Sequence, residues 1–130
     1  MTFTSVVPDH MKPMYDQYQF SPAIRQGDLV IISGQVGIRS DFTVAETLDE
    51  QLDLVFGHLK TLMEHAGGNL SHILELNSFH VGDLGAQMGP FIAAKARHMR
   101  EPHCAWTAVG VTQLALPGLF VEVRAMGRVV

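Results

Sequence analysis

The stretch from about Val44 to Ala66 constrains the fold of this chain most, because it predicts one long amphipathic helix. Thr47 and Glu50 have the spacing of a capping box at its start, and Gly67 follows at its end. Apolar side chains recur every three or four residues and form one stripe: Leu48, Leu52, Val55, Leu59, Leu62, Met63 and Ala66. A helix with such a stripe buries it against another layer of structure.

Strand patterns on both sides of this helix predict that the other layer is a β-sheet. Short apolar runs bounded by turn residues predict four strands, and a second helical stretch has Pro90 near its start. The predicted strands are Asp28–Val36, Ile73–Val81, about His103–Leu114 and Leu119–Val129, and the second helix spans Gly85–Arg100. The segment Phe20–Ile24 is compatible with an edge strand or an irregular lead-in. A sheet with both helices on one face leaves an apolar second face, which a closed homo-oligomer can cover.

One domain accounts for the whole chain. Its 130 residues, 47% hydrophobic and 17% charged, have the composition of a single globular unit. We expect residues 1–19 to be a loosely ordered N-terminal segment and residues 20–130 to form the domain. The N-terminal sequence lacks the charged start and apolar block of a secretory signal, and no apolar run reaches membrane-spanning length. We therefore expect a cytoplasmic protein with no membrane partner.

Charge and side-chain spacing argue against several classes of function. The formal net charge is −4 and the basic residues are scattered, which disfavours nucleic-acid binding. The single Cys104 cannot form an internal disulfide, and a packed, inert thiol is its expected state. The seven histidines do not have the spacing of a metal site, and the sequence contains no phosphate-binding loop, Cys-x-x-Cys pair or nucleophilic-serine motif. The residues alone therefore disfavour a metal site.

Two strand positions carry residues with chemical potential. Trp106, the only tryptophan, shares one side of its strand with Ala108, and a small residue beside a large ring leaves room for a cavity. Glu122 and Arg124 share one side of the last strand among apolar neighbours, a setting that displaces the pKa of a carboxyl group. An ordinary surface ion pair between these two residues is the alternative interpretation.

Four segments together resemble the RidA (YjgF) family of imine/enamine deaminases, also labelled the endoribonuclease L-PSP family. They are "FSPAIRQGDLVIISGQVG", "QLDLVFGHLKTLMEHAGG", "ILELNSFHV" and "VGVTQLALPGLFVEVRA", and they follow the family's order from Phe20 to the end of the chain. Within the family, "WTAVGV", "SFH" and "SGQVG" are most similar to the YjgH-like branch.

The resemblance implies a chorismate-mutase-like α+β fold, with a six-stranded mixed sheet and two helices on one face. It also implies a homotrimer with clefts between subunits and no metal or organic cofactor. In deaminating relatives an arginine binds the substrate carboxylate, a glutamate positions the attacking water, and a tyrosine lines the pocket. By position Glu122 matches the glutamate, and Ser33 and Gly34 match the strand beside the pocket.

Two positions depart from the deaminating members. Phe20 replaces the tyrosine, and Trp106 in "CAWT" replaces the arginine of a "PARS" stretch. A guanidinium donates two charge-assisted hydrogen bonds to a carboxylate, whereas an indole donates one neutral N–H. The exchange is expected to weaken selection of a carboxylate by roughly tenfold to several hundredfold. Arg124 either substitutes in part for the missing arginine or neutralises the charge of Glu122.

These observations favour a homotrimer that binds a small metabolite and hydrolyses an imine or enamine. The expected catalytic residue is Glu122, and the expected substrate-binding residues are Trp106, Phe20, Ser33, Gly34, Ala108 and Arg124. A non-catalytic binding or regulatory trimer is the alternative. An endoribonuclease, the third reading of the family label, is disfavoured by the acidic charge and by the lack of an acid/base histidine pair on a basic surface.

Overall fold

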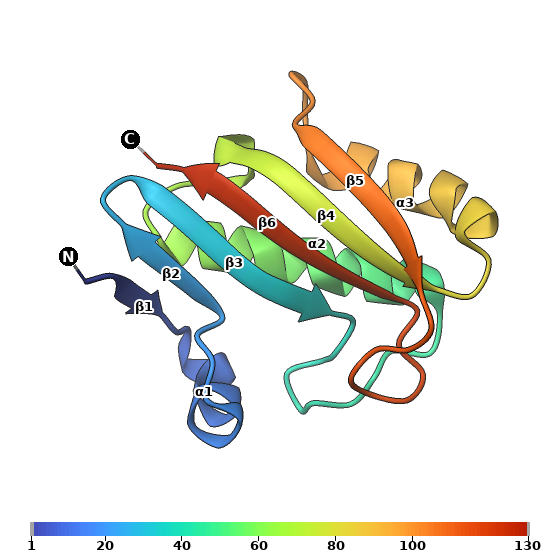
Figure 1. Ribbon diagram of the computed structural model, residues 1–130, viewed down its shortest axis with the longest axis horizontal. Coiled ribbons are helices and arrows are strands. Elements are labelled where there is room, and N and C mark those ends of the chain that lie inside the picture. The colour runs from blue at the N-terminus through green and yellow to red at the C-terminus, as the bar shows by residue number, and fades with distance from the viewer. Residues whose placement is uncertain (1, 130) are drawn as a thin grey trace.

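The protein folds as one mixed β-sheet with helices packed on one face, as the computed structural model shows for residues 2–129 (Figure 1). The six strands are arranged in the order β1-β2-β3-β6-β4-β5. They span Thr4–Val6 (β1), Ala23–Gln26 (β2), Leu29–Val36 (β3), Ile73–Val81 (β4), Ala105–Val111 (β5) and Val121–Arg128 (β6). Only β4 and β5 pair in parallel, and every other neighbouring pair is antiparallel. The six-stranded mixed sheet expected from the family resemblance is confirmed.

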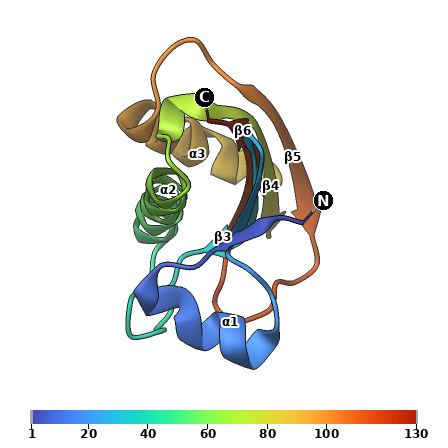
Figure 2. The same cartoon turned by 90° about the vertical axis from the view of Figure 1, so that its left-hand side faces the viewer.

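Helices α2 (Leu48–His65) and α3 (Leu84–His98) cover the same face of the sheet (Figure 2). Thr47 caps α2 by accepting a hydrogen bond from the backbone N–H of Glu50, as the capping box predicted. The apolar stripe of α2 is fully buried against the inward side of the sheet from Leu52 to Met63, together with Phe91 of α3, whereas Leu48 at its start is partly buried. The opposite face of the sheet carries no helix, and we call it the open face.

The first residues contain more regular structure than the sequence indicated. Strand β1, a short 3-10 turn η1 (Asp9–Met11) and helix α1 (Lys12–Tyr18) lie within the segment expected to be loosely ordered. Figure 1 shows α1 below β1 and β2, at the end of the sheet rather than on the helix-covered face. The Phe20–Ile24 segment contributes Ala23 and Ile24 to β2, which lies between β1 and β3 and is therefore not an edge strand. A second 3-10 turn, η2 (Leu70–His72), leads into β4.

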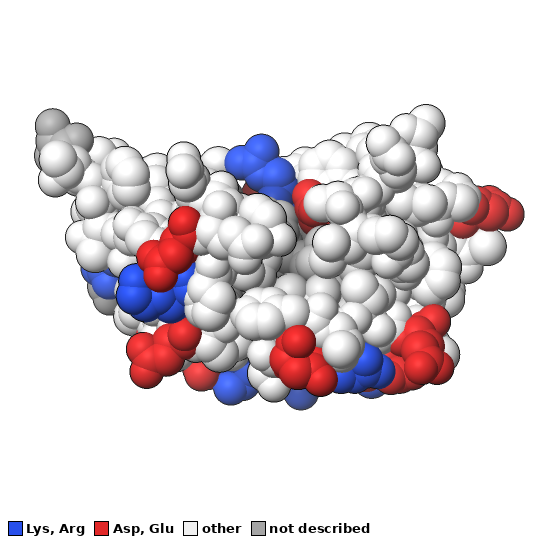
Figure 3. Space-filling model, turned by 90° about the horizontal axis from the view of Figure 1, so that it is seen from below, with Lys and Arg blue, Asp and Glu red and all other residues white. Residues whose placement is uncertain are grey.

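Pairing registers define which side chains share the open face. Val109, Phe79, Glu122 and Val36 form one row across β5, β4, β6 and β3. Figure 3 views the molecule from below, so that the open face lies along the upper edge; most side chains there are uncharged, whereas charges of both signs gather on the helix side. Among the described residues, no helix is both long enough and apolar enough to span a membrane.

Candidate functional site

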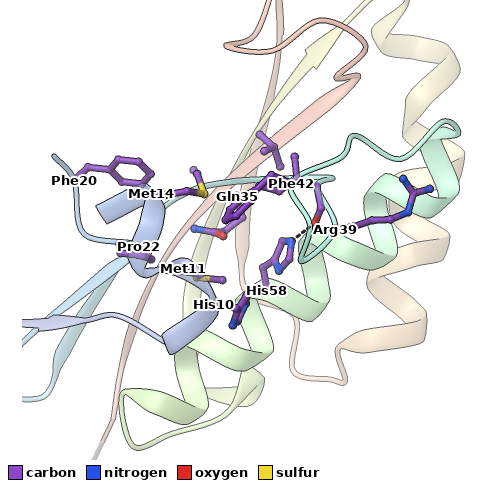
Figure 4. Close-up of a pocket in the computed structure, with 12 residues that line it drawn as sticks. His10, Met11, Met14, Phe20, Pro22, Gln35, Arg39, Phe42 and His58 are labelled. Atoms are coloured by element: carbon purple, nitrogen blue, oxygen red, sulfur yellow. Dashed lines mark hydrogen bonds between the residues drawn. The ribbon is translucent and has the colours of Figure 1, made fainter. Parts of the chain in front are cut away.

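A pocket lies where the end of β3 meets α1, the loop after β3 and the middle of α2 (Figure 4). It encloses about 440 Å³ when the space at its open mouth is included. Phe20 and Gly34, both expected at the site from the sequence, line it. Its other walls come from residues that the sequence did not single out, among them Met14, Gln35 and His58.

The Glu122 side chain lies against the backbone of Gly34, which lines this pocket, although Glu122 itself is not a lining residue. A β-carbon at position 34 would overlap the side-chain carboxyl group of Glu122. The register of β3 against β6 slips between Ile32 and Gln35, and Gly34 lies within this irregularity. Gly34 of β3 therefore lines the pocket and also leaves space for the side chain of Glu122 on the neighbouring strand β6.

The Glu122 carboxyl group lies in an apolar setting without a compensating charge. Its direct neighbours across the sheet are Phe79 and Val36, and no hydrogen bond or ion pair holds it within residues 2–129. Burial raises the pKa of Glu122 above its ordinary value, because desolvation disfavours the charged form. The ion pair with Arg124, one interpretation of the sequence, is absent from the described residues.

Glu122→Gln is expected to raise the melting temperature at neutral and mildly alkaline pH. The folded pKa of Glu122 lies above its unfolded value, so the unfolded chain releases this proton first and stability falls as pH rises between the two values. Glutamine mimics the protonated carboxyl group and removes this loss. Thermal melts should show the advantage at pH 7 to 8 and its disappearance below the ordinary pKa of 4.5. An advantage independent of pH would contradict the burial argument.

Gly34→Ala is expected to lower activity with little effect on stability. The new methyl group would meet the far end of the Glu122 side chain, which moves at small cost, but the carboxyl group would then leave its position. Displacement of a reacting group by about 1 Å costs up to roughly 100-fold in rate. Gly57→Ala in α2, where a β-carbon meets open space, is the control. Equal activity of the two variants would show that the position of Glu122 is not critical.

The remaining site residues on the sheet divide between its two faces. Ser33 donates its Oγ–H to the carbonyl of Ser21 at 2.7 Å, so its hydroxyl holds the lead-in to β2. Arg124 is exposed on the open face beside Glu122 and pairs in register with Asn77. Trp106 and Ala108 lie on β5, separated from β3 by β6 and β4. Both pair with inward-facing residues of β4, so they point toward the helices rather than toward Glu122.

Trp106 takes part in a buried polar chain that sequence analysis missed. Its Nε1–H donates to Ser78 Oγ at 2.8 Å, and Ser78 Oγ lies 2.8 Å from His80 Nε2. The other ring nitrogen of His80 lies 2.8 Å from Gln87 Oε1. The indole also stacks on Phe91 of α3, with ring centroids 4.9 Å apart. Within one subunit, therefore, the indole N–H is already engaged and Trp106 does not meet Glu122.

Cys104 is partly buried, and no cluster of potential metal ligands surrounds it among the described residues. Burial raises the pKa of the Cys104 thiol, which keeps it protonated and unreactive at neutral pH. No group of three histidine, cysteine, aspartate or glutamate residues with metal-binding geometry occurs within residues 2–129.

Comparisons with known proteins give one consistent result. The family model described as Endoribonuclease L-PSP matches residues 12–129. The RutC family protein YjgH of Escherichia coli strain K12 is 35% identical over 127 residues, which cover 97% of this chain and 95% of that protein. A solved structure of protein YjgH has a TM-score of 0.88 at 35% identity and covers 99% of this chain and 98% of its own. RidA from the Antarctic bacterium Psychrobacter sp. PAMC 21119 has a TM-score of 0.80 at 29% identity, with coverage of 85% and 88%.

Proposed function

Since the chain belongs to the endoribonuclease L-PSP family, also known as the RidA/YjgF family, we propose that it hydrolyses a small reactive imine or enamine. The observation that supports this most is the unpaired carboxyl group of Glu122 beside the pocket wall at Gly34. A raised pKa brings a carboxyl group closer to neutral pH, where it both accepts and returns protons efficiently.

The proposed reaction needs only water and Glu122. Glu122 accepts one proton of water as the water oxygen attacks the carbon of the C=N bond, and it returns that proton to the nitrogen to give a carbinolamine. Glu122 then accepts the hydroxyl proton of the carbinolamine and passes it to the amine as the C–N bond breaks, so that ammonia leaves and the carboxylate is restored. One imine and one water thus give one carbonyl compound and one ammonia; an enamine first tautomerises to the imine.

The proposed assembly is a homotrimer that buries the open face and forms the clefts between subunits. Exposed apolar residues on and beside this face support it: Leu74, Val109 and Phe120 are 54%, 41% and 37% exposed. In such a trimer a neighbouring subunit completes the site, and residues such as Arg124 on the open face contact that neighbour.

Val109→Lys is expected to dissociate the assembly, because a charge on the open face cannot be buried without a partner. Ile92→Lys is the control: Ile92 is 54% exposed, against 41% for Val109, but it lies on α3 on the helix side of the sheet. This variant should leave the assembly intact. Size-exclusion chromatography with light scattering measures both masses. A Val109→Lys variant with the wild-type mass would exclude this part of the open face from the interface.

The direct test of the activity measures ammonia. 2-Aminoacrylate or a neutral imine is generated in solution, and ammonia release is followed with and without protein whose assembly has been verified. Faster release with protein is expected. An unchanged rate with both substrates would reject hydrolysis.

A binding or regulatory trimer without catalysis is the second candidate, and the replacement of arginine by Trp106 favours it. The indole N–H of Trp106 already donates to Ser78 Oγ, so the Trp106 side chain has no free donor with which to bind a substrate carboxylate. Saturable change of the Trp106 fluorescence by a metabolite that is not consumed would support this candidate over the hydrolase.

A further inference from the structure

His58 presents an unused hydrogen-bond acceptor at the pocket. Its Nε2 lies 2.9 Å from the carbonyl oxygen of Ile38, and a carbonyl only accepts, so the proton is on Nε2. Burial lowers the pKa of His58, which keeps the ring neutral. Nδ1 is therefore an acceptor, and it has no partner among the described residues.

Gln35 presents a second acceptor from the opposite wall. Its Nε2 donates to the carbonyl of Ser33 at 3.1 Å, which directs the amide and leaves Oε1 as an acceptor with no partner in the described part of the chain. Gln35 is only 7% exposed. Figure 4 shows Gln35 on the strand and His58 on the helix, across the pocket from one another. The two acceptors are not orphaned in the core, since no buried side-chain nitrogen or oxygen of the described residues lacks a partner, so they are accessible from the pocket. A ligand with N–H groups can therefore replace water as their donor.

Among residues 2–129, no uncompensated cation and no carboxylate lines the same pocket. Arg39, the one arginine there, donates to Thr43 Oγ1 and the Val44 carbonyl and forms a 3.2 Å ion pair with Glu50. Its side chain leads away from the pocket in Figure 4. The remaining titratable neighbour, His10, is exposed near His58. An anionic ligand would find no free counter-charge here.

The rest of the lining is apolar and comes largely from the N-terminal region. Met11 and Met14 belong to η1 and α1, and Phe20 and Phe42 add aromatic surface. Apolar walls with a few placed polar groups are typical of small-molecule sites. The first residues, which the sequence left as an ill-defined segment, thus build part of the specificity surface.

We propose that this pocket selects an uncharged, apolar small molecule through its N–H groups, which donate to His58 Nδ1 and Gln35 Oε1. This inference rests on the proposed function, and together they identify the substrate as an apolar imine or enamine without a carboxylate. The replacement of the relatives' arginine by Trp106 agrees with selection of an uncharged ligand, since such a substrate needs no guanidinium.

Three probes of similar shape test the selection by calorimetry or ligand-detected NMR on the full chain. Benzamide offers N–H donors, acetophenone replaces the amide nitrogen by a methyl group, and benzoate carries a charge and no donor. Benzamide is expected to bind roughly five- to 100-fold more tightly than acetophenone, the worth of two hydrogen bonds, and benzoate more weakly still. Addition of benzamide should also shift the ¹⁵N resonance of His58 Nδ1.

His58→Leu and Gln35→Met each remove one of the two acceptors and are each expected to weaken benzamide binding by roughly three- to tenfold. His65→Leu, at an exposed histidine of the same helix, is the control. Equal affinity for benzamide and acetophenone in the wild type, or an unmoved His58 resonance, would overturn the proposal even where a variant fails to fold. Benzoate binding that depends on Arg124 would instead place the ligand on the open face. Selective benzamide binding without ammonia release from imines would reject the hydrolase and retain the ligand class.

Discussion

Replacing Gln51 with leucine is expected to lower the free energy of unfolding by about 2 to 5 kcal/mol, because three backbone groups would lose their partner. Gln51 is fully buried in α2. Its Nε2 donates to the carbonyls of Ala45 and Gly118 at 3.0 and 2.8 Å, and its Oε1 accepts from the N–H of Phe120 at 2.8 Å. One side chain thus ties the loop before α2 to the loop before β6.

The comparison that isolates this effect is Gln113→Leu, in the loop between β5 and β6. Gln113 is exposed, so the same substitution there removes no buried hydrogen bond. Chemical denaturation of both variants measures the difference. If Gln51→Leu proves as stable as Gln113→Leu, then water or a rearranged loop satisfies the three backbone groups, and Gln51 is not what holds the two loops together. Because Phe120 leads directly into β6, loosening this tie also disturbs the approach to Glu122.

Signals local to the sequence predicted the main elements well. The capping box and the apolar stripe placed α2 to within a few residues, and β4 spans the predicted Ile73–Val81. The predicted strand at about His103–Leu114 is shorter in the structure, where β5 covers Ala105–Val111. The elements that were missed or left open are short: α1 has seven residues, β1 has three, and β2, for which a strand was one of two options, has four. Such strands lack enough residues for a periodic pattern and exist through pairing with distant partners.

The candidate site was predictable only in part, and the reason is the sheet's two-sided geometry. Alternation showed that Trp106 and Ala108 share a side, and that Glu122 and Arg124 share a side. It did not show that the first pair faces the helices and the second pair the open face. That distinction depends on the pairing of β4 with both β5 and β6, which no local pattern encodes.

The pocket itself joins segments that are far apart in the sequence. Gly34 and Phe20 came from the family resemblance, but His58 was only one of seven histidines in the chain. Its position on the inward side of α2 near Ile38 gives it a role, and that position follows from the path of the loop between β3 and α2. The one available signal was a polar residue next to the apolar stripe of a well-defined helix.

Glu122→Gln is expected to reduce imine hydrolysis by about 100- to 10,000-fold, the range that proton transfer by a positioned side chain contributes. Glutamine keeps the shape and the hydrogen-bonding capacity of the protonated carboxyl group, so binding of an apolar N–H donor such as benzamide should persist. Glu75→Gln is the matched control, because Glu75 lies on the open face of neighbouring β4.

The pH dependence of the wild-type rate provides a second, independent test of the role of Glu122. Ionised Glu122 accepts the proton of water, so the rate should rise with pH through the pKa of this carboxyl group, which burial raises above its ordinary value. That rise should vanish in Glu122→Gln and persist in Glu75→Gln. If Glu122→Gln keeps both the rate and its rise with pH, the attacking water is activated by another group, and the carboxyl group beside Gly34 serves only to shape the cleft.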